Sequence, residues 1–117
     1  MEDLNSILVS GQLWKIHQFQ LESKEGIWIS MWDEWKFIEA EKLHSVYIEN
    51  SSKEKVLEAT KDGKVILEVK DEDKDEQLWK KGVPDNEGYF TLENEHGKVL
   101  TAISSFDLEI KGNMTLR

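Results

Sequence analysis

Hydrophobic and polar residues alternate in two stretches of the chain. In residues 65–70 every second side chain is an aliphatic Val or Leu, and in residues 107–111 Leu108 and Ile110 lie between charged residues. A period of two is typical of strands with one buried face. We therefore predict β-strands here. No stretch shows sustained helical periodicity, and residues 39–43 can form at most one helical turn, which has no packing to offset its nucleation cost.

Turn signals separate the predicted strands at intervals of about eight to twelve residues, a spacing typical of an all-β barrel or sandwich. Because Gly, Asn, Asp and Pro favour turns for distinct backbone reasons, these dipeptides and tripeptides mark the ends of strands. They are Ser10-Gly11, Glu25-Gly26, Asp62-Gly63, Pro84-Asp85-Asn86, His96-Gly97 and Gly112-Asn113. The chain is therefore predicted to be all-β.

Short phrases of sequence recur along the chain. Residues 46–50 and 55–59 resemble residues 89–94 and 98–102, and residues 21–27 align with 57–63 if one extra residue is allowed. A polar residue, a spacer, a Trp and a Lys recur at 33–36 and at 77–80. These matches predict three pseudo-repeats, at about residues 7–43, 44–86 and 87–117, each with room for four short strands. Such repeats fit one closed β-trefoil domain over residues 1–117 better than an open sheet.

The recurring Trp phrase resembles the signature of the ricin-type β-trefoil, a family of lectin-like domains whose repeats end in Gln-x-Trp. The signature is complete at Gln77-Leu78-Trp79, is degraded at Asp33-Glu34-Trp35 and is absent at Thr115-Leu116-Arg117. We expect Trp35, Gln77 and Trp79 to be structural residues, with both tryptophans in the core.

A further copy of the signature, Gln12-Leu13-Trp14, lies out of phase with the repeats assigned above. It is consistent with a permuted register, in which the N-terminal hairpin completes the last repeat. That register leaves one strand too many, so we prefer the first assignment.

The resemblance implies where a sugar would bind. In ricin-type repeats an Asp after the second strand accepts hydrogen bonds from sugar hydroxyls, and an aromatic residue on the third strand stacks on the sugar ring. This chain has Glu22, Glu58 and Thr101 at the Asp positions, a serious departure, because side-chain length sets where the acceptor lies. The first repeat keeps the most suitable residues. Its predicted carbohydrate-binding residues are Glu22, Trp28, Trp32 and Asp33.

These residues also have structural interpretations. Trp28 and Trp32 would share one face of a strand, and a Trp that points inward is a packing residue. Glu22 and Glu58 can equally be solvated charges at strand ends. In the other repeats the stacking position holds Phe106 or the aliphatic residues 65–69.

The charge balance narrows the set of partners. The chain has 15 basic and 24 acidic residues, a formal net charge of −9, which repels nucleic-acid phosphates and anionic membranes. It has no Cys, and its first residues lack the basic and apolar segments of a signal peptide. We therefore expect no nucleic-acid or membrane partner and a cytoplasmic or otherwise unexported location.

No motif indicates catalysis, a cofactor or a metal ion. Residues 71–75 begin like an EF-hand loop, but Glu76 stands where that loop needs Gly, and Gly82 stands where it needs the closing acid. The three His residues are too widely spaced to form a metal-ligand pair.

The sequence therefore predicts a protein that is not an enzyme. The first hypothesis is a carbohydrate-binding, lectin-like module with at most one weak sugar site, in the first repeat. The alternative is a β-trefoil that binds another protein and has lost sugar binding.

Overall fold

The computed structural model describes residues 11–42 and 44–112. This part of the chain is all-β, as the periodicity predicted, and none of its helices is long and apolar enough to span a membrane. Both alternating stretches are strands. The strands are β1 (Trp14–His17), β2 (Gln20–Ser23), β3 (Trp28–Ile29), β4 (Trp35–Glu39), β5 (Ser45–Asn50), β6 (Lys55–Ala59), β7 (Val65–Glu68), β8 (Trp79–Lys81), β9 (Leu92–Glu93), β10 (Val99–Ser104) and β11 (Asp107–Lys111), and a short 3-10 helix, η1, spans Asp75–Gln77.

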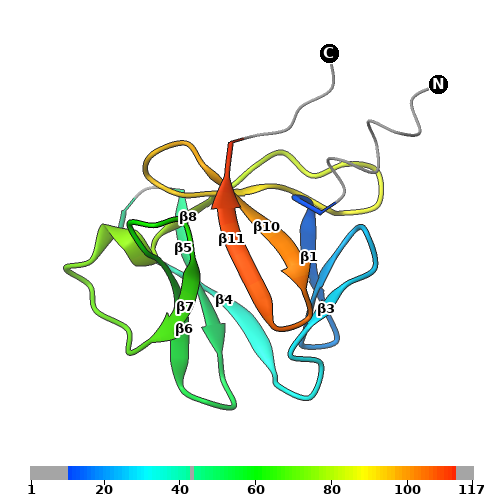
Figure 1. The fold of residues 1–117 in the computed structure, drawn as a ribbon, viewed down its shortest axis with the longest axis horizontal. Helices are drawn as coiled ribbons and strands as arrows, with labels where there is room; N and C mark the ends of the chain where they lie inside the picture. Colours follow the sequence, from blue (N-terminus) through cyan, green and yellow to red (C-terminus); the bar gives the residue numbers. More distant parts are fainter. Residues whose placement is uncertain (1–10, 43, 113–117) are drawn as a thin grey trace.

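The strands β1, β2, β4, β5, β8 and β9 follow one another around a barrel-like ring. Figure 1 shows β1, β4, β5 and β8 of this ring. β1 pairs with β2, β4 with β5, and β8 with both β5 and β9. The Trp35 amide donates to the Phe19 carbonyl at 2.7 Å, which links β4 to the start of β2. Trp14 and Phe90 exchange two backbone hydrogen bonds, of 2.8 and 2.9 Å, which close the ring.

Two longer hairpins, β6–β7 and β10–β11, lie side by side beyond this ring. The Ile110 amide donates to the Gly63 carbonyl at 2.9 Å, and Lys64 Nζ lies 2.7 Å from Glu109 Oε2. Gly63 has a φ of +88°, a conformation that a side chain would strain. Between β3 and β4, in contrast, residues 30–34 form only turns and bends.

Three buried tryptophans each make the same kind of contact in the core, a hydrogen bond from the indole N–H to a backbone carbonyl. The indole of Trp14 donates to the Leu100 carbonyl at 2.9 Å, that of Trp79 to Leu57 at 3.2 Å, and that of Trp35 to Ile29 at 3.0 Å. All six residues are buried. A buried indole N–H without a partner costs free energy, so each bond fixes the tryptophan against one strand.

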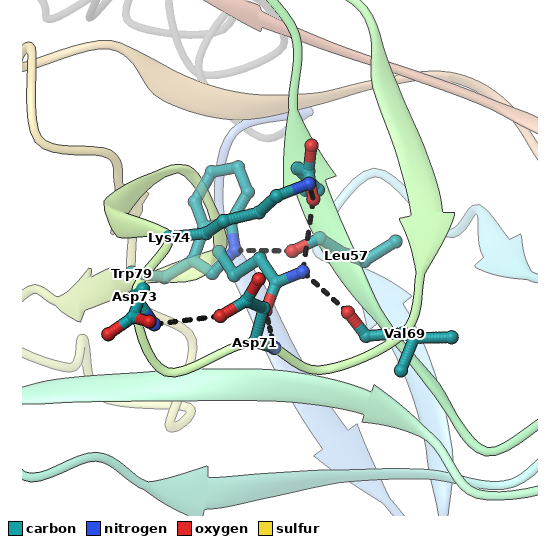
Figure 2. A network of polar contacts seen from close by, with 8 residues as sticks. Leu57, Val69, Asp71, Asp73, Lys74 and Trp79 are labelled. Carbon is teal, nitrogen blue, oxygen red and sulfur yellow. Dashed lines mark hydrogen bonds and ion pairs between the residues drawn. The ribbon is translucent and has the colours of Figure 1, made fainter.

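The signature glutamine Gln77 is held in the polar network drawn in Figure 2. Its Nε2 donates to Glu58 Oε1 at 3.0 Å and to the Val69 carbonyl at 2.9 Å, while its Oε1 accepts from the Asp71 amide at 2.8 Å. Gln77 is fully buried, and its contacts fasten the loop after β7 to β6.

Gln12 makes the matching contacts. Its Nε2 donates to Thr101 Oγ1 at 3.1 Å and to the Gly112 carbonyl at 3.0 Å. Thr101 follows Leu100 as Glu58 follows Leu57, so Gln12-Leu13-Trp14 and Gln77-Leu78-Trp79 occupy equivalent environments.

Three turns of the described chain contain the same backbone hydrogen bond. The Gly26 amide donates to the Ser23 carbonyl, the Gly63 amide to the Thr60 carbonyl and the Gly97 amide to the Asn94 carbonyl. The bond therefore recurs in both of the aligned segments, 21–27 and 57–63, and in residues 92–97 as well.

A partly buried polar contact joins the turn before β4 to β5. Asp33 Oδ2 accepts from Asn50 Nδ2 at 2.8 Å and lies 3.1 Å from Lys53 Nζ. The hydrogen bond from Asn50, and then the Lys53 ammonium, hold the pKa of the Asp33 carboxyl below its usual value. Asn50 itself is fully buried, so Asp33 is the partner that satisfies its side-chain N–H.

We expect Trp14→Ala to lower the free energy of unfolding as much as Trp79→Ala, by about 3–5 kcal/mol, because each change leaves a large cavity and removes a buried hydrogen bond. Trp32→Ala is the control, because this side chain is 90% exposed. Urea denaturation followed by circular dichroism measures all three. A stability of Trp14→Ala equal to that of the control would contradict the closure of the ring by Trp14.

We expect Asp33→Ala to cost about 1–3 kcal/mol at neutral pH, because Asn50 is left buried without an acceptor. The ionised Asp33 is stabilised by folding, so its contribution is present above its unfolded pKa of about 3.9 and is lost as pH falls through the lower folded value. Urea denaturation between neutral pH and about pH 2 should therefore show the difference from the wild type shrinking in acid. Asp73→Asn, which changes an exposed carboxylate, is the control. An acid-insensitive difference would rule out this role of the carboxylate.

Candidate functional site

The outer face of the β1–β2–β3 sheet carries a row of three side chains. Lys15 is the cross-strand partner of Glu22, and Glu22 is the partner of Trp28. Directly paired residues lie on one face, with Cβ atoms about 4.5–5.5 Å apart. Trp28 is 40% exposed, and Lys15 and Glu22 are half-buried. The three side chains therefore present a cation, a carboxylate and an aromatic ring in sequence across the sheet.

An aromatic ring flanks the cationic end of this row. Lys15 Nζ lies 4.5 Å and Lys24 Nζ 5.8 Å from the centre of the Tyr89 ring. Lys24 also lies 2.7 Å from Asp85 Oδ2, and this hydrogen bond raises the pKa of the Lys24 ammonium. We call Lys15, Glu22, Trp28 and Tyr89 the Trp28 row.

A shallow hollow of about 590 Å³ adjoins Trp28 on the side away from Lys15's strand. Met31, Ser104 and Ser105 contribute to its lining, and the Ser30 amide donates to the Ser105 carbonyl at 3.0 Å. The turn after β3 is thus fastened to the tip of the β10–β11 hairpin. The ring of Trp28 is accessible beside hydroxyl and backbone groups.

The structure brings together two of the four predicted sugar-binding residues. Glu22 and Trp28 are direct partners. Trp32 does not share a strand face with Trp28, because β3 ends at Ile29 and Ser30 turns the chain with a φ of +42°. Asp33 already accepts from Asn50 and pairs with Lys53, so its carboxylate is engaged.

Glu58 and Thr101, which the family resemblance compares with Glu22, make internal contacts. Glu58 Oε1 accepts from Gln77 and lies 3.4 Å from Lys74 Nζ (Figure 2). Thr101 is buried, accepts from Gln12 and donates to the Val99 carbonyl. Glu22 lies on β2 instead, as the cross-strand partner of both Lys15 and Trp28.

Sequence reasoning missed Lys15 and Tyr89. Lys15 follows Trp14 directly in the chain. Because neighbouring residues of a strand point to opposite faces, assigning Trp14 to the core would have placed Lys15 on the outer face. Tyr89 gave no comparable signal, because its approach to Lys15 depends on the pairing of Trp14 with Phe90, which are far apart in the sequence.

A second hollow, of about 560 Å³, lies between the turns at residues 60–63 and 94–98. Its described lining holds charges of both signs, such as Lys61, Asp62 and Glu95, and includes no Trp, Tyr or Phe. Its one aromatic ring among the described lining residues is the imidazole of His96, which offers a sugar less stacking area than an indole, so the Trp28 row is the better candidate.

Two carboxylates of the acidic loop at residues 71–75 accept hydrogen bonds from within the chain. Asp71 Oδ1 accepts from the Asp73 amide at 2.9 Å, and Asp75 Oδ1 accepts from Lys42 Nζ at 2.7 Å. Within residues 11–42 and 44–112, no group of three His, Cys, Asp or Glu side chains is placed to hold a metal ion.

Comparisons with known proteins relate the chain to solved structures alone. No protein-family model and no curated protein matches the sequence. A chain in the crystal structure of the cytolethal distending toxin of Haemophilus ducreyi matches with a TM-score of 0.55 and 15% sequence identity. The match covers 67% of this chain and 49% of the toxin chain, so this protein spans about half of that chain's length. At this identity the likeness is one of fold: this chain shares an all-β architecture with part of the toxin.

Proposed function

We propose that the fold is a β-trefoil in a permuted register. Its three units would be residues 18–39, residues 45–81, and residues 90–112 completed by residues 12–17. The equivalent indole bonds of Trp14, Trp35 and Trp79, and the matching glutamine contacts of Gln12 and Gln77, support this assignment. In this register β1 belongs to the last unit, so no strand is left over when the strands are divided among the three units.

We further propose that the protein is a non-catalytic carbohydrate-binding module with one weak site, the Trp28 row. The observation that carries this proposal is the pairing of the exposed Trp28 with Glu22 across β2 and β3. The apolar face of a sugar ring would stack on the indole, and the Glu22 carboxylate would accept hydrogen bonds from hydroxyls beside it. Lys15 would donate to a ring or hydroxyl oxygen at the other side of Glu22.

The arrangement also explains why binding would be weak. The row lies on an open sheet face, so a single sugar would bury one side only, and a monovalent site of this kind has a Kd near millimolar, about −4 kcal/mol. Useful affinity would require several copies or a larger ligand that contacts Tyr89 as well.

The second candidate function is binding of another protein. It is favoured by large apolar side chains that are exposed around residues 28–32 and 103–106. Exposed apolar surface on this scale is more typical of an interface than of a single sugar site. The two candidates share Trp28, but Trp32 and Phe106 belong to the apolar surface alone, so substitutions at these two residues test protein binding separately.

We expect titration of galactosides and glucosides to shift the NMR signals of residues around Trp28 and Glu22, with a Kd near millimolar. Trp28→Ala should abolish these shifts, because it removes the stacking surface, and Glu22→Gln should weaken binding by about tenfold, the loss of one charged hydrogen bond. Both changes lie on the exposed face of the sheet, so stability should change little.

The matched control for this titration is Trp32→Ala, which removes a more exposed indole from the neighbouring turn and should leave sugar binding unchanged. Shifts confined to residues 45–81 would place a sugar site elsewhere. An absence of shifts with every sugar would refute the carbohydrate proposal and leave protein binding as the function.

A further inference from the structure

One end of the barrel lacks a hairpin that the other two units have. Leu57 lies on β6, which forms a hairpin with β7, and Leu100 lies on β10, which forms a hairpin with β11. Between Ile29 and Trp35, which make the equivalent indole contact, there are only residues 30–34. At this position the chain cannot supply a hairpin to cover the core.

A hollow of about 370 Å³ lies at this end, where all three units meet. Buried core side chains, including Ile29, Trp35 and Leu57, form part of its lining. Two exposed residues line it as well: Ile66 of the β6–β7 hairpin, 38% exposed, and Phe106 of the β10–β11 hairpin, 87% exposed. This volume lies in the range of about 300–1,000 Å³ that binding pockets occupy, and it suits an apolar side chain.

The charges around this hollow favour a basic partner. Among the described residues that line it, the charged one is Lys53, which lies 3.1 Å from Asp33 and is thereby neutralised. Glu34, Glu54 and Asp107 each adjoin a lining residue in sequence. Glu109, and to a smaller degree Asp107, raises the pKa of the Lys64 ammonium, which is paired with Glu109, so Asp107 keeps part of its charge for a ligand. The formal net charge of −9 adds long-range attraction for cations.

We propose that this hollow binds an extended, basic segment of another protein, which inserts one apolar side chain between Phe106 and Ile66. Lysines or arginines on either side of that side chain would pair with Glu34, Glu54 and Asp107. The partner thus covers the part of the core that a hairpin covers in the other two units. A second copy of this chain fits poorly, because it brings another net charge of −9 to the same surface.

This site is separate from the Trp28 row, because the hollow lies at the end of the barrel and the row on the outer face of the β1–β2–β3 sheet. Trp28 does not line the hollow, and Phe106 does not belong to the row. The proposal is therefore independent of sugar binding.

A pair of short blocked peptides tests this inference: one has a central Phe between pairs of Lys, and the other has Glu in place of every Lys. Titrated into the ¹⁵N-labelled chain, the Lys peptide should shift the amides of Ile29, Ser30 and Leu108 and the indole of Trp35 in a saturable manner. Added salt should weaken its binding, because exposed charges are screened. The Glu peptide should give no saturable shifts.

Variants distinguish the hollow from the rest of the surface. Phe106→Ser should weaken binding of the Lys peptide about tenfold, since it removes an exposed apolar contact without opening the core. Val83→Ser, at another exposed aliphatic residue, and Trp28→Ala, in the sugar site, should leave peptide binding unchanged. Equal binding of both peptides, an unaffected Phe106→Ser, or no shifts at the hollow would overturn the proposal. Concentration-dependent shifts at the hollow without peptide would identify a second copy as the occupant and overturn it as well.

Discussion

The bond from a buried indole N–H to a backbone carbonyl is the contact on which this fold depends. It occurs at Trp14, Trp35 and Trp79. Trp14 and Trp79 are each bonded to the first strand of a hairpin, β10 or β6, and Trp35 is bonded to β3, the strand before the short turn at residues 30–34. An indole is large enough to fill the centre of a small barrel, yet its N–H must find an acceptor there. The distance and direction of that bond therefore fix where the neighbouring strand can lie.

Because these side chains hold the core together, the residues available to bind a ligand lie on the surface. Gln77 and Gln12 hold loops in place through hydrogen bonds, so these signature residues have structural roles. Glu58 and Thr101 are the acceptors of those hydrogen bonds. What remains accessible is the Trp28 row on the outer sheet face and the apolar hollow at the shortened unit. The first presents a ring beside a carboxylate, and the second presents core side chains beside acidic residues. These two chemistries suit different ligands.

Local patterns in the sequence were sufficient to predict the all-β class and the strands at residues 65–68 and 107–111. The family resemblance placed Glu22 near Trp28, and the two are cross-strand partners. The matching contacts of Gln12-Leu13-Trp14 and Gln77-Leu78-Trp79 were not predicted, because strand counting assumed that each unit is contiguous in the chain. Trp14 pairs with Phe90, and nothing local to either residue encodes that contact. The contact between Asp33 and Asn50 was missed for a similar reason: Asn50 lies on β5, and it meets Asp33 only because β4 and β5 pair.

The central structural claim is that Trp14, Trp35 and Trp79 are equivalent, and the most direct measurement is hydrogen exchange of the five indole N–H groups by NMR. The indoles of these three tryptophans should exchange slowly and at similar rates, because each is buried and bonded to a backbone carbonyl. Those of Trp28 and Trp32, which are exposed, should exchange rapidly. An indole of Trp14 that exchanges as fast as that of Trp32 would contradict the claim, because the N-terminal strand would then not complete the barrel.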